Sequence, residues 1–246
     1  MKLKEYLVEI EKFIKDYLNN SGQKSFVLGV SGGIDSALVA ALTVKAVGKE
    51  RLLALLMPID SHESDLRDGL ALVDKFGIPH RVIDLSDIYH SLCAKYEMVN
   101  ADGCDLALNN TKVRLRMVTL YAFAQERGAL VLGTDNADEI HVGYFTKYGD
   151  GAADLAPIAE LNKGEVFEAS RLLGVPDVIL ERVPTAGLFR GQTDEKELGV
   201  TYDQLDRYLL GEKMPETVER RIQELHRMSA HKRNPIPRPI KFDRTK

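Results

Sequence analysis

The sequence is poor in the residues that mark several classes of protein. Its 246 residues include no tryptophan and two cysteines, Cys93 and Cys104, which form no CxxC pair. We therefore expect neither a disulfide framework nor a zinc site, and a reducing cytoplasm is the simplest setting. No run of about 18 apolar residues occurs, so no membrane span is expected. The formal net charge of −4 argues against a surface built to bind nucleic acid.

The rest of the composition is that of an ordinary globular protein. With 44% hydrophobic and 28% charged residues, the chain is expected to form one domain over residues 1–246. The N-terminal segment predicts an amphipathic helix and not a signal peptide, because charges separate apolar residues at helical spacing. These residues are Leu3, Leu7, Ile10, Ile14 and Leu18.

Strand-like and helix-like segments alternate in the first half of the chain. Strands are expected at 25–30, 52–57, 80–85 and 129–132, with helices at about 36–47, 61–76, 86–95 and 106–127. The alternation predicts an α/β fold with a doubly wound parallel sheet of about five strands and helices on both faces. Ligands of such sheets bind beyond the carboxyl ends of the strands. The glycine turns after Val30 and Leu132 both follow expected strands, which places the site there.

Beyond Gly133 the pattern becomes irregular. Segments 145–154 and 184–199 are rich in glycine and polar residues, and we interpret them as functional loops that could close over a site. Helical patterns resume at about 163–173, 201–210 and 216–228.

The sharpest motif is the segment 29–36, Gly-Val-Ser-Gly-Gly-Ile-Asp-Ser, which directly follows the first expected strand. Adjacent glycines let backbone N–H groups approach a ligand, and the next helix adds the positive end of its dipole, so the loop can cradle an anion. Asp35 would repel phosphate unless a cation lay between them, which predicts Mg²⁺. A helix-capping serine would explain a bare SGG, but not the whole motif in this place. No Walker loop and no GxGxxG occur.

The segment SGGIDSA resembles the pyrophosphatase loop of the PP-loop ATP pyrophosphatases, also called adenine nucleotide alpha-hydrolases. The resemblance implies their three-layer sandwich fold and cleavage of ATP between its α- and β-phosphates. The superfamily includes NAD synthetases, GMP synthetases and tRNA-thiolating enzymes. The loop alone does not choose among them.

Further segments resemble those of NAD synthetases, in the same order and along nearly the whole chain. They are 110–117 (NTKVRLRM), 133–139 (GTDNADE), 144–151 (YFTKYGDG), 153–158 (ADLAPI), 161–163 (LNK), 184–186 (PTA), 192–195 (QTDE), Tyr202-Asp203 and 231–233 (HKR). The resemblance implies an ammonia-dependent enzyme that amidates deamido-NAD, the last step of NAD biosynthesis. ATP would give AMP and pyrophosphate through an acyl-adenylate. A homodimer is also implied.

The resemblance further implies roles for individual residues. Those expected to bind ATP are Gly29, Val30, Ser31, Gly32, Gly33, Ile34, Asp35, Ser36, Thr134, Lys163 and Thr185. Those expected to bind deamido-NAD are Arg114, Lys147, Asp154, His231 and Lys232, and those expected to bind Mg²⁺ are Asp35 and Glu139. Standing alone, Arg114 and Arg116 would be interpreted as solvated charges, and Glu139 as an acid at a helix start.

Amide formation also needs a proton acceptor, because ammonia at neutral pH is mostly ammonium. A buried carboxylate could bind ammonium and then take its proton, and Asp150 in the YGDG turn is our candidate. Ser31 and Lys163, with the N–H groups of residues 31–33, are expected to stabilise the phosphoryl transfer. Neither cysteine lies in a nucleophile signature, so free ammonia is favoured over glutamine. A separately encoded glutaminase stays open.

Three alternatives remain open on the sequence alone. A tRNA-modifying PP-loop enzyme would need a broad basic face, which the net charge disfavours. A GMP-synthetase-like ligase would lack the YGDG and HKR segments. A non-catalytic ATP-binding module would be expected to lose the metal-binding acids, whereas Asp35 and Glu139 are both present.

Overall fold

The computed structural model describes residues 2–98, 105–182, 193–242 and 244. Its parallel sheet consists of β1 (Ser25–Gly29), β2 (Leu52–Leu56), β3 (His80–Val82) and β4 (Ala129–Val131), in the order β3-β2-β1-β4. The helices are α1 (Leu3–Ser21), α2 (Ile34–Val47), α3 (Glu63–Phe76), α4 (Ser86–Tyr96), α5 (Leu106–Arg127), α6 (Ala137–Val142), α7 (Lys163–Leu172), α8 (Asp177–Leu180), α9 (Asp194–Leu198), α10 (Tyr202–Leu209), α11 (Glu216–Met228) and α12 (Ala230–Arg233), with a 3-10 turn, η1 (Lys49–Arg51).

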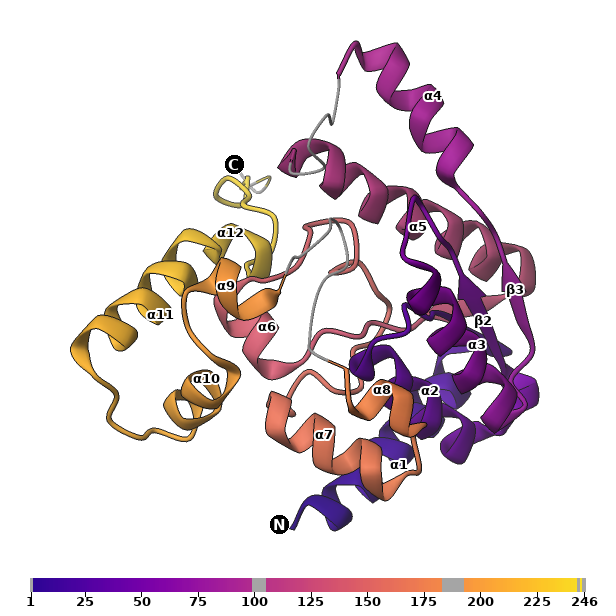
Figure 1. Ribbon diagram of the computed structural model, residues 1–246, viewed down its shortest axis with the longest axis horizontal. Helices are drawn as coiled ribbons and strands as arrows, with labels where there is room; N and C mark the ends of the chain where they lie inside the picture. Colours follow the sequence, from indigo (N-terminus) through magenta and orange to yellow (C-terminus); the bar gives the residue numbers. More distant parts are fainter. Residues whose placement is uncertain (1, 99–104, 183–192, 243, 245–246) are drawn as a thin grey trace.

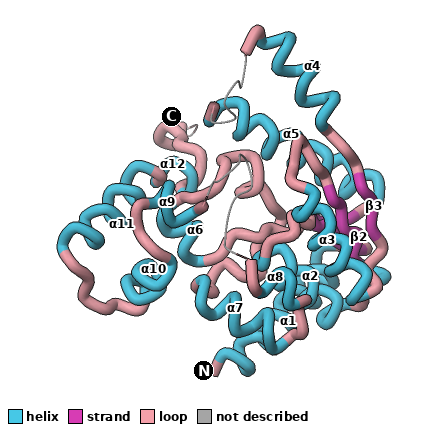
Figure 2. The backbone as a smooth tube through the Cα atoms, in the orientation of Figure 1, coloured by secondary structure: helices cyan, strands magenta, loops and turns pink. Residues whose placement is uncertain are grey.

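Helices cover both faces of this sheet. Successive strand residues point to opposite faces, so Phe26 and Leu28 pack with α1, α2, α3 and α7, whereas Val27 packs with α4 and α5. Figures 1 and 2 show the strands between these two helical layers. The doubly wound α/β sandwich predicted from the sequence is thereby confirmed.

The described sheet has four strands where we expected about five. Beyond β4, a single parallel bridge joins Leu132 to Leu155 and continues the pairing by one residue pair. The edge strand β3 ends at Val82, three residues before the expected end. All three of its residues are exposed, so little burial favours a longer strand there.

The strand order places the site. The chain runs outward from β1 to β2 and β3, then returns to the other side of β1 to form β4. The order therefore reverses between β1 and β4, and the loops after these two strands lie on either side of the crevice where α/β proteins bind ligands.

The C-terminal helices form a separate layer beside this crevice. Val142 of α6, Tyr202 and Leu205 of α10 and Ile222 of α11 form a third apolar cluster. Helix α10 contacts both α6 and α7, on the side away from the sheet (Figure 1). Over the part of the chain that the structure describes, no helix has the length and apolar character needed to cross a membrane.

Candidate active site

The loop between β1 and α2 is held closed by its own serines. The Gly33 N–H donates to the Ser31 Oγ at 3.2 Å, and the Ser36 Oγ lies 3.2 Å from the same oxygen. Gly32 has a φ of +81°, and a Cβ there would lie 2.4 Å from the carbonyl oxygen of Asp65 on α3. Glycine alone meets both conditions. The loop thus lies closed at the N-terminus of α2, a place where the helix dipole favours an anion.

A cavity of about 620 Å³ adjoins this loop. Its volume is in the range of sites that bind small molecules. Most residues that we expected to bind ATP or metal, or to act in catalysis, line it. They are Gly29, Val30, Ser31, Gly33, Ile34, Asp35, Ser36, Thr134, Glu139, Asp150 and Lys163. Gly32 packs against α3 instead, and Thr185 lies outside the described residues.

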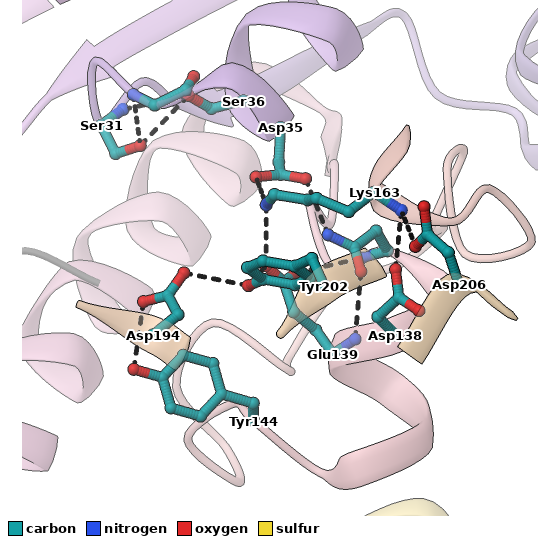
Figure 3. A network of polar contacts seen from close by, with 12 residues as sticks. Ser31, Asp35, Ser36, Asp138, Glu139, Tyr144, Lys163, Asp194, Tyr202 and Asp206 are labelled. Carbon is teal, nitrogen blue, oxygen red and sulfur yellow. Dashed lines mark hydrogen bonds and ion pairs between the residues drawn. The ribbon is translucent and has the colours of Figure 1, made fainter. Parts of the chain in front are cut away.

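The two candidate metal ligands meet across one lysine. Lys163 Nζ lies 2.6 Å from Asp35 Oδ2 and 3.2 Å from Glu139 Oε1, and its side chain is only 3% exposed (Figure 3). Asn136 completes the group by donating its amide to Asp35 Oδ1 at 2.9 Å. The acids come from different helices, α2 and α6, and the lysine comes from α7. Tertiary packing therefore brings together residues that are far apart in the sequence.

Capping boxes fix where α6 and α7 begin, and these helices carry Glu139 and Lys163. Asn136 and Glu139 form a capping box at the start of α6, and Asn162 and Glu165 form one at the start of α7. Each box satisfies N–H groups that the first helical turn leaves unpaired. Because Glu139 Oε2 accepts from the Asn136 N–H, its other oxygen faces Lys163.

Burial and charge oppose each other in this cluster. Burial raises the pKa of Glu139 to about 7, although Lys163 acts in the other direction. Burial disfavours the charge on Lys163, but Asp35 and Glu139 outweigh it, so the pKa of this lysine is raised above its usual value. The ammonium is therefore charged at neutral pH and offsets part of the negative charge of the two acids.

Asp150 lines the cavity and also shapes its own turn. Its Oδ1 accepts from the Thr146 N–H at 2.7 Å and from the Gly151 N–H at 3.1 Å. Burial raises the pKa of Asp150. Burial also raises the pKa of Asp135, which lies in the loop after β4, and the charges of Asp150, Glu139 and Asp35 add to the effect. The sequence interpretation gave Asp135 no role, although it lies within the GTDNADE segment.

Of the residues expected to bind deamido-NAD, the structure gathers four around segment 143–147. Lys147 Nζ donates to the His231 carbonyl at 2.6 Å, and Arg114 donates to the Lys147 carbonyl at 3.3 Å. Lys232 Nζ donates to the Gly143 and Phe145 carbonyls at 2.7 and 2.6 Å, and it alone of the four lines the cavity.

The fifth of these residues, Asp154, lies apart from the others at the sheet. Its Oδ2 accepts the Val131 N–H of β4 at 2.7 Å, and its Oδ1 lies 3.5 Å from the Tyr121 hydroxyl. This carboxylate therefore anchors the segment that follows the YGDG turn to the end of β4.

Arg116 and Asp203, which both lie in segments that resemble those of NAD synthetases, differ in their surroundings. Arg116 is not a solvated charge: its Nε donates to the Met57 carbonyl at 2.9 Å, and it lines the cavity. Asp203, which we paired with Tyr202, points outward with its side chain 78% exposed. Asp206, one helical turn beyond Tyr202, contacts α7 in its place. The helical spacing of four residues could have identified Asp206.

Known proteins resemble this chain over nearly its whole length. A family model described as NAD synthase matches residues 6–236. The NH(3)-dependent NAD(+) synthetase of Mesoplasma florum is 47% identical over 244 residues, which cover 99% of this chain and all of the relative.

Two solved structures show how similar the folds are. A structure of NMN synthetase from Francisella tularensis superposes with a TM-score of 0.92 at 40% identity and covers 98% of this chain and 100% of its own. The NH3-dependent NAD synthetase from Campylobacter jejuni, solved in complex with nitrate, gives 0.80 at 28% identity with the same coverage. The family expected from the sequence is confirmed: the chain belongs to the NAD synthase family.

Proposed function

We propose that this chain amidates deamido-NAD with ammonia, while ATP is cleaved to AMP and pyrophosphate. The chain is a member of the NAD synthase family and hence an amide-forming ligase that uses ATP. The observation that carries the chemistry is the meeting of the anion-binding loop with Asp35, Glu139 and Lys163 at one cavity. Family membership argues against the tRNA-modifying, GMP-synthetase-like and non-catalytic alternatives.

The first step joins the nicotinate carboxylate to the nucleotide. A carboxylate oxygen attacks the α-phosphorus, the bond to the β-phosphate oxygen breaks, and pyrophosphate leaves. Catalysis of such a step depends on alignment and charge neutralisation. The N–H groups of residues 31–33 and the hydroxyl of Ser31 would bind phosphate oxygens, and the buried ammonium of Lys163 would offset the charge that develops on the leaving group.

The oxygen donors of the site fit a magnesium ion. Asp35 and Glu139 each direct one carboxylate oxygen at the Lys163 ammonium, so the place between them already accommodates a cation. Carboxylate oxygens are the donors that Mg²⁺ prefers, with the remaining positions taken by phosphate oxygens and water. These two residues would hold the metal, which would neutralise phosphate charge when bound.

The second step forms the amide. Ammonia attacks the acyl carbon of the adenylate, the C–O bond to the phosphate breaks, and AMP leaves. Two protons must depart, one from the ammonium ion and one from the added nitrogen. Asp150 is our candidate for the acceptor of the ammonium proton, and the second proton would leave to water or to the departing AMP. Asp150 lies on the cavity wall, and burial raises its pKa, which makes the carboxylate a stronger base than an exposed one.

A second candidate substrate rests on a specific observation. The chain superposes more closely on the Francisella NMN synthetase than on the Campylobacter NAD synthetase, with TM-scores of 0.92 and 0.80. An enzyme that makes NMN by amidation would act on the mononucleotide acid. The reacting carboxylate and the nucleotide loop are unchanged in that case, and only the adenylate half of the acceptor is missing.

The proposal also gives roles to the other residues expected to bind deamido-NAD and includes a homodimer. Arg114, Lys147 and His231 lie next to one another but outside the cavity lining, so deamido-NAD would extend from the cavity across them. A homodimer would cover exposed apolar side chains of α5, such as Leu106 and Val118, and sedimentation would measure it.

The test is a product analysis. The protein is incubated with Mg-ATP, ammonium and either deamido-NAD or the mononucleotide acid, and amide, AMP and pyrophosphate are quantified. We expect AMP and pyrophosphate in equal amounts with the amide, and the higher kcat/KM identifies the acceptor. ADP with orthophosphate as products, or no turnover with either acid, would exclude the proposal.

A further inference from the structure

Helix α10 holds the backbone end of Lys163. Asp206 accepts the Lys163 N–H with Oδ1 at 3.2 Å and the Gly164 N–H with Oδ2 at 2.9 Å. Asp138 also accepts the Lys163 N–H, at 2.6 Å. These N–H groups lie in the first turn of α7, where no intrahelical partner exists. Asp206 therefore fixes the point from which the lysine side chain leaves its helix.

The same helix supports the charged end of this side chain. Lys163 Nζ lies 4.9 Å from the centre of the Tyr202 ring. The ring is buried, and its hydroxyl lies 2.9 Å from Asp194 Oδ2 and 3.4 Å from Glu139 Oε1. Figure 3 shows the lysine running from Asp206 at one end, over Tyr202, to Asp35 at the other.

Tyr202 and Asp206 are one helical turn apart, so they share one face of α10. We propose that this face positions Lys163, with Asp206 anchoring its backbone and Tyr202 its ammonium, so that the charge is aligned for the triphosphate of ATP. Tyr202 and Asp206 are positioning residues in this account, since the contacts that carry it are made with Lys163. The inference rests on the proposed function, because the lysine is taken to act on ATP.

The physical reason lies in the length of the lysine side chain. A free lysine has many rotamers, and immobilising it on a ligand loses conformational freedom. Contacts that hold both ends before the ligand arrives remove that cost from binding. Aromatic faces also attract ammonium groups electrostatically. A carboxylate at a helix N-terminus would stabilise α7 in any case, so a purely structural role is the alternative to be tested.

A double-mutant cycle distinguishes the positioning of Lys163 from a purely structural role of Asp206 and Tyr202. Asp206→Ala and Tyr202→Leu are each made in the wild type and in a Lys163→Ala background, and Asp203→Ala on the exposed side of α10 is the control. The readouts are the dissociation constant of Mg-ATP, from calorimetry, and the thermal unfolding midpoint. Changes in residues that support a binding group typically cost about 10–100-fold. We expect about a tenfold weaker Mg-ATP complex in each wild-type-background variant and an unchanged one in the control.

In the Lys163→Ala background we expect Asp206→Ala and Tyr202→Leu to weaken Mg-ATP binding by less than about twofold, because residues that act through one group are not additive. Equal losses in both backgrounds, or no loss in the wild type, would overturn the inference.

If Asp206→Ala does not fold, Asp206→Asn, which keeps one acceptor, takes its place in the cycle. Tyr202→Phe keeps the ring, and we expect this variant to bind Mg-ATP more tightly than Tyr202→Leu. Equal losses of affinity in both variants would show that the ring does not position Lys163. Failure of wild-type protein to bind Mg-ATP would instead refute the proposed function.

Discussion

Lys163 Nζ lies 2.6 Å from Asp35 Oδ2, and this contact joins two residues separated by 128 positions in the chain. The same ammonium contacts Glu139, so one positive charge lies between the two carboxylates expected to bind Mg²⁺. A cation placed between these carboxylates would compete with the ammonium for their oxygens. The lysine thus offsets part of the negative charge of the cluster in the protein.

Replacing Lys163 should lower the free energy of unfolding. Lys163→Met leaves Asp35 and Glu139 without their cation, and breaking a buried pair costs about 3–5 kcal/mol. Because these acids are partly accessible, we expect the free energy of unfolding in urea to fall by about 3 kcal/mol. Millimolar Mg²⁺ should restore part of it, since a ligand that binds only the folded state stabilises that state.

The control for this prediction is Lys45→Met. Lys45 pairs with Glu11 at 2.7 Å, but its side chain is 54% exposed. We expect a loss of less than about 1 kcal/mol and no response to Mg²⁺. A similar Mg²⁺ response in both variants would contradict the assignment of Asp35 and Glu139.

Gly32→Ala should disable the phosphate loop. The substitution combines a φ of +81° with a clash against the Asp65 carbonyl, costing about 1 kcal/mol for the backbone and about 1–3 kcal/mol for the overlap. Relief of the clash moves the loop away from α3, so Mg-ATP binding should weaken as well. Gly174→Ala is the matched control, because Gly174 has a φ of +73° and open space around it. The Gly174→Ala variant should lose about 1 kcal/mol of unfolding free energy and bind Mg-ATP normally. If both variants weaken Mg-ATP binding equally, the prediction is wrong.

His141 should make stability depend on pH. Burial, followed by the nearby His226 and Arg233, lowers the pKa of His141 from 6.5 to about 4. The neutral ring is thus favoured in the folded protein, so its contribution is fully present above pH 6.5 and is lost as the pH falls toward 4. Because the ring is only half buried, we expect about 1 kcal/mol of this loss between pH 8 and pH 5. His141→Phe removes the titration and should lose less stability over this range, as measured by urea unfolding; parallel curves would contradict the prediction.

The sequence predicted those parts of the structure that depend on local pattern. The strand before Val30, the glycine turn and α2 follow one another within about twenty residues, and a short apolar run, two adjacent glycines and a longer apolar run identify them in turn. The capping box of Asn136 and Glu139 is equally local, although it was not predicted. The family motifs then supplied the candidate acids, although not their distances.

The parts that could not be predicted depend on tertiary contacts. Helix α5 buries Asn109 and Lys112, so its polar pattern conceals which face meets the sheet, and the contact of Arg116 with Met57 could not be predicted from the helix alone. Similarly, no local signal places the Lys163 ammonium between two acids of other helices. Such positions are set by how three helices pack, which the sequence pattern of any one of them does not contain.

Asp150→Asn should separate the two chemical steps. The side chain has two functions in the structure, because its Oδ1 accepts the Thr146 and Gly151 N–H groups while the residue lines the cavity. Asparagine keeps an oxygen for the two N–H groups but cannot accept a proton from ammonium. The turn should therefore remain, and adenylate formation, measured as pyrophosphate release without ammonia, should be largely retained. Amide formation should fall about 100-fold or more, the scale of a lost general base.

Asp150→Ala provides the comparison for that variant. It removes the one oxygen that accepts both N–H groups of the turn, and a part-buried N–H group such as that of Thr146 costs about 1–3 kcal/mol when it is left unpaired. Both partial reactions should then decline together with the unfolding midpoint, because the loop that carries Thr146 and Gly151 is no longer fixed. If Asp150→Asn lowers both partial reactions equally while the unfolding midpoint is unchanged, the carboxylate is needed before ammonia enters. The acceptor of the ammonium proton would then have to be another acid of the cavity, and Asp135, whose pKa burial raises, is the next to test.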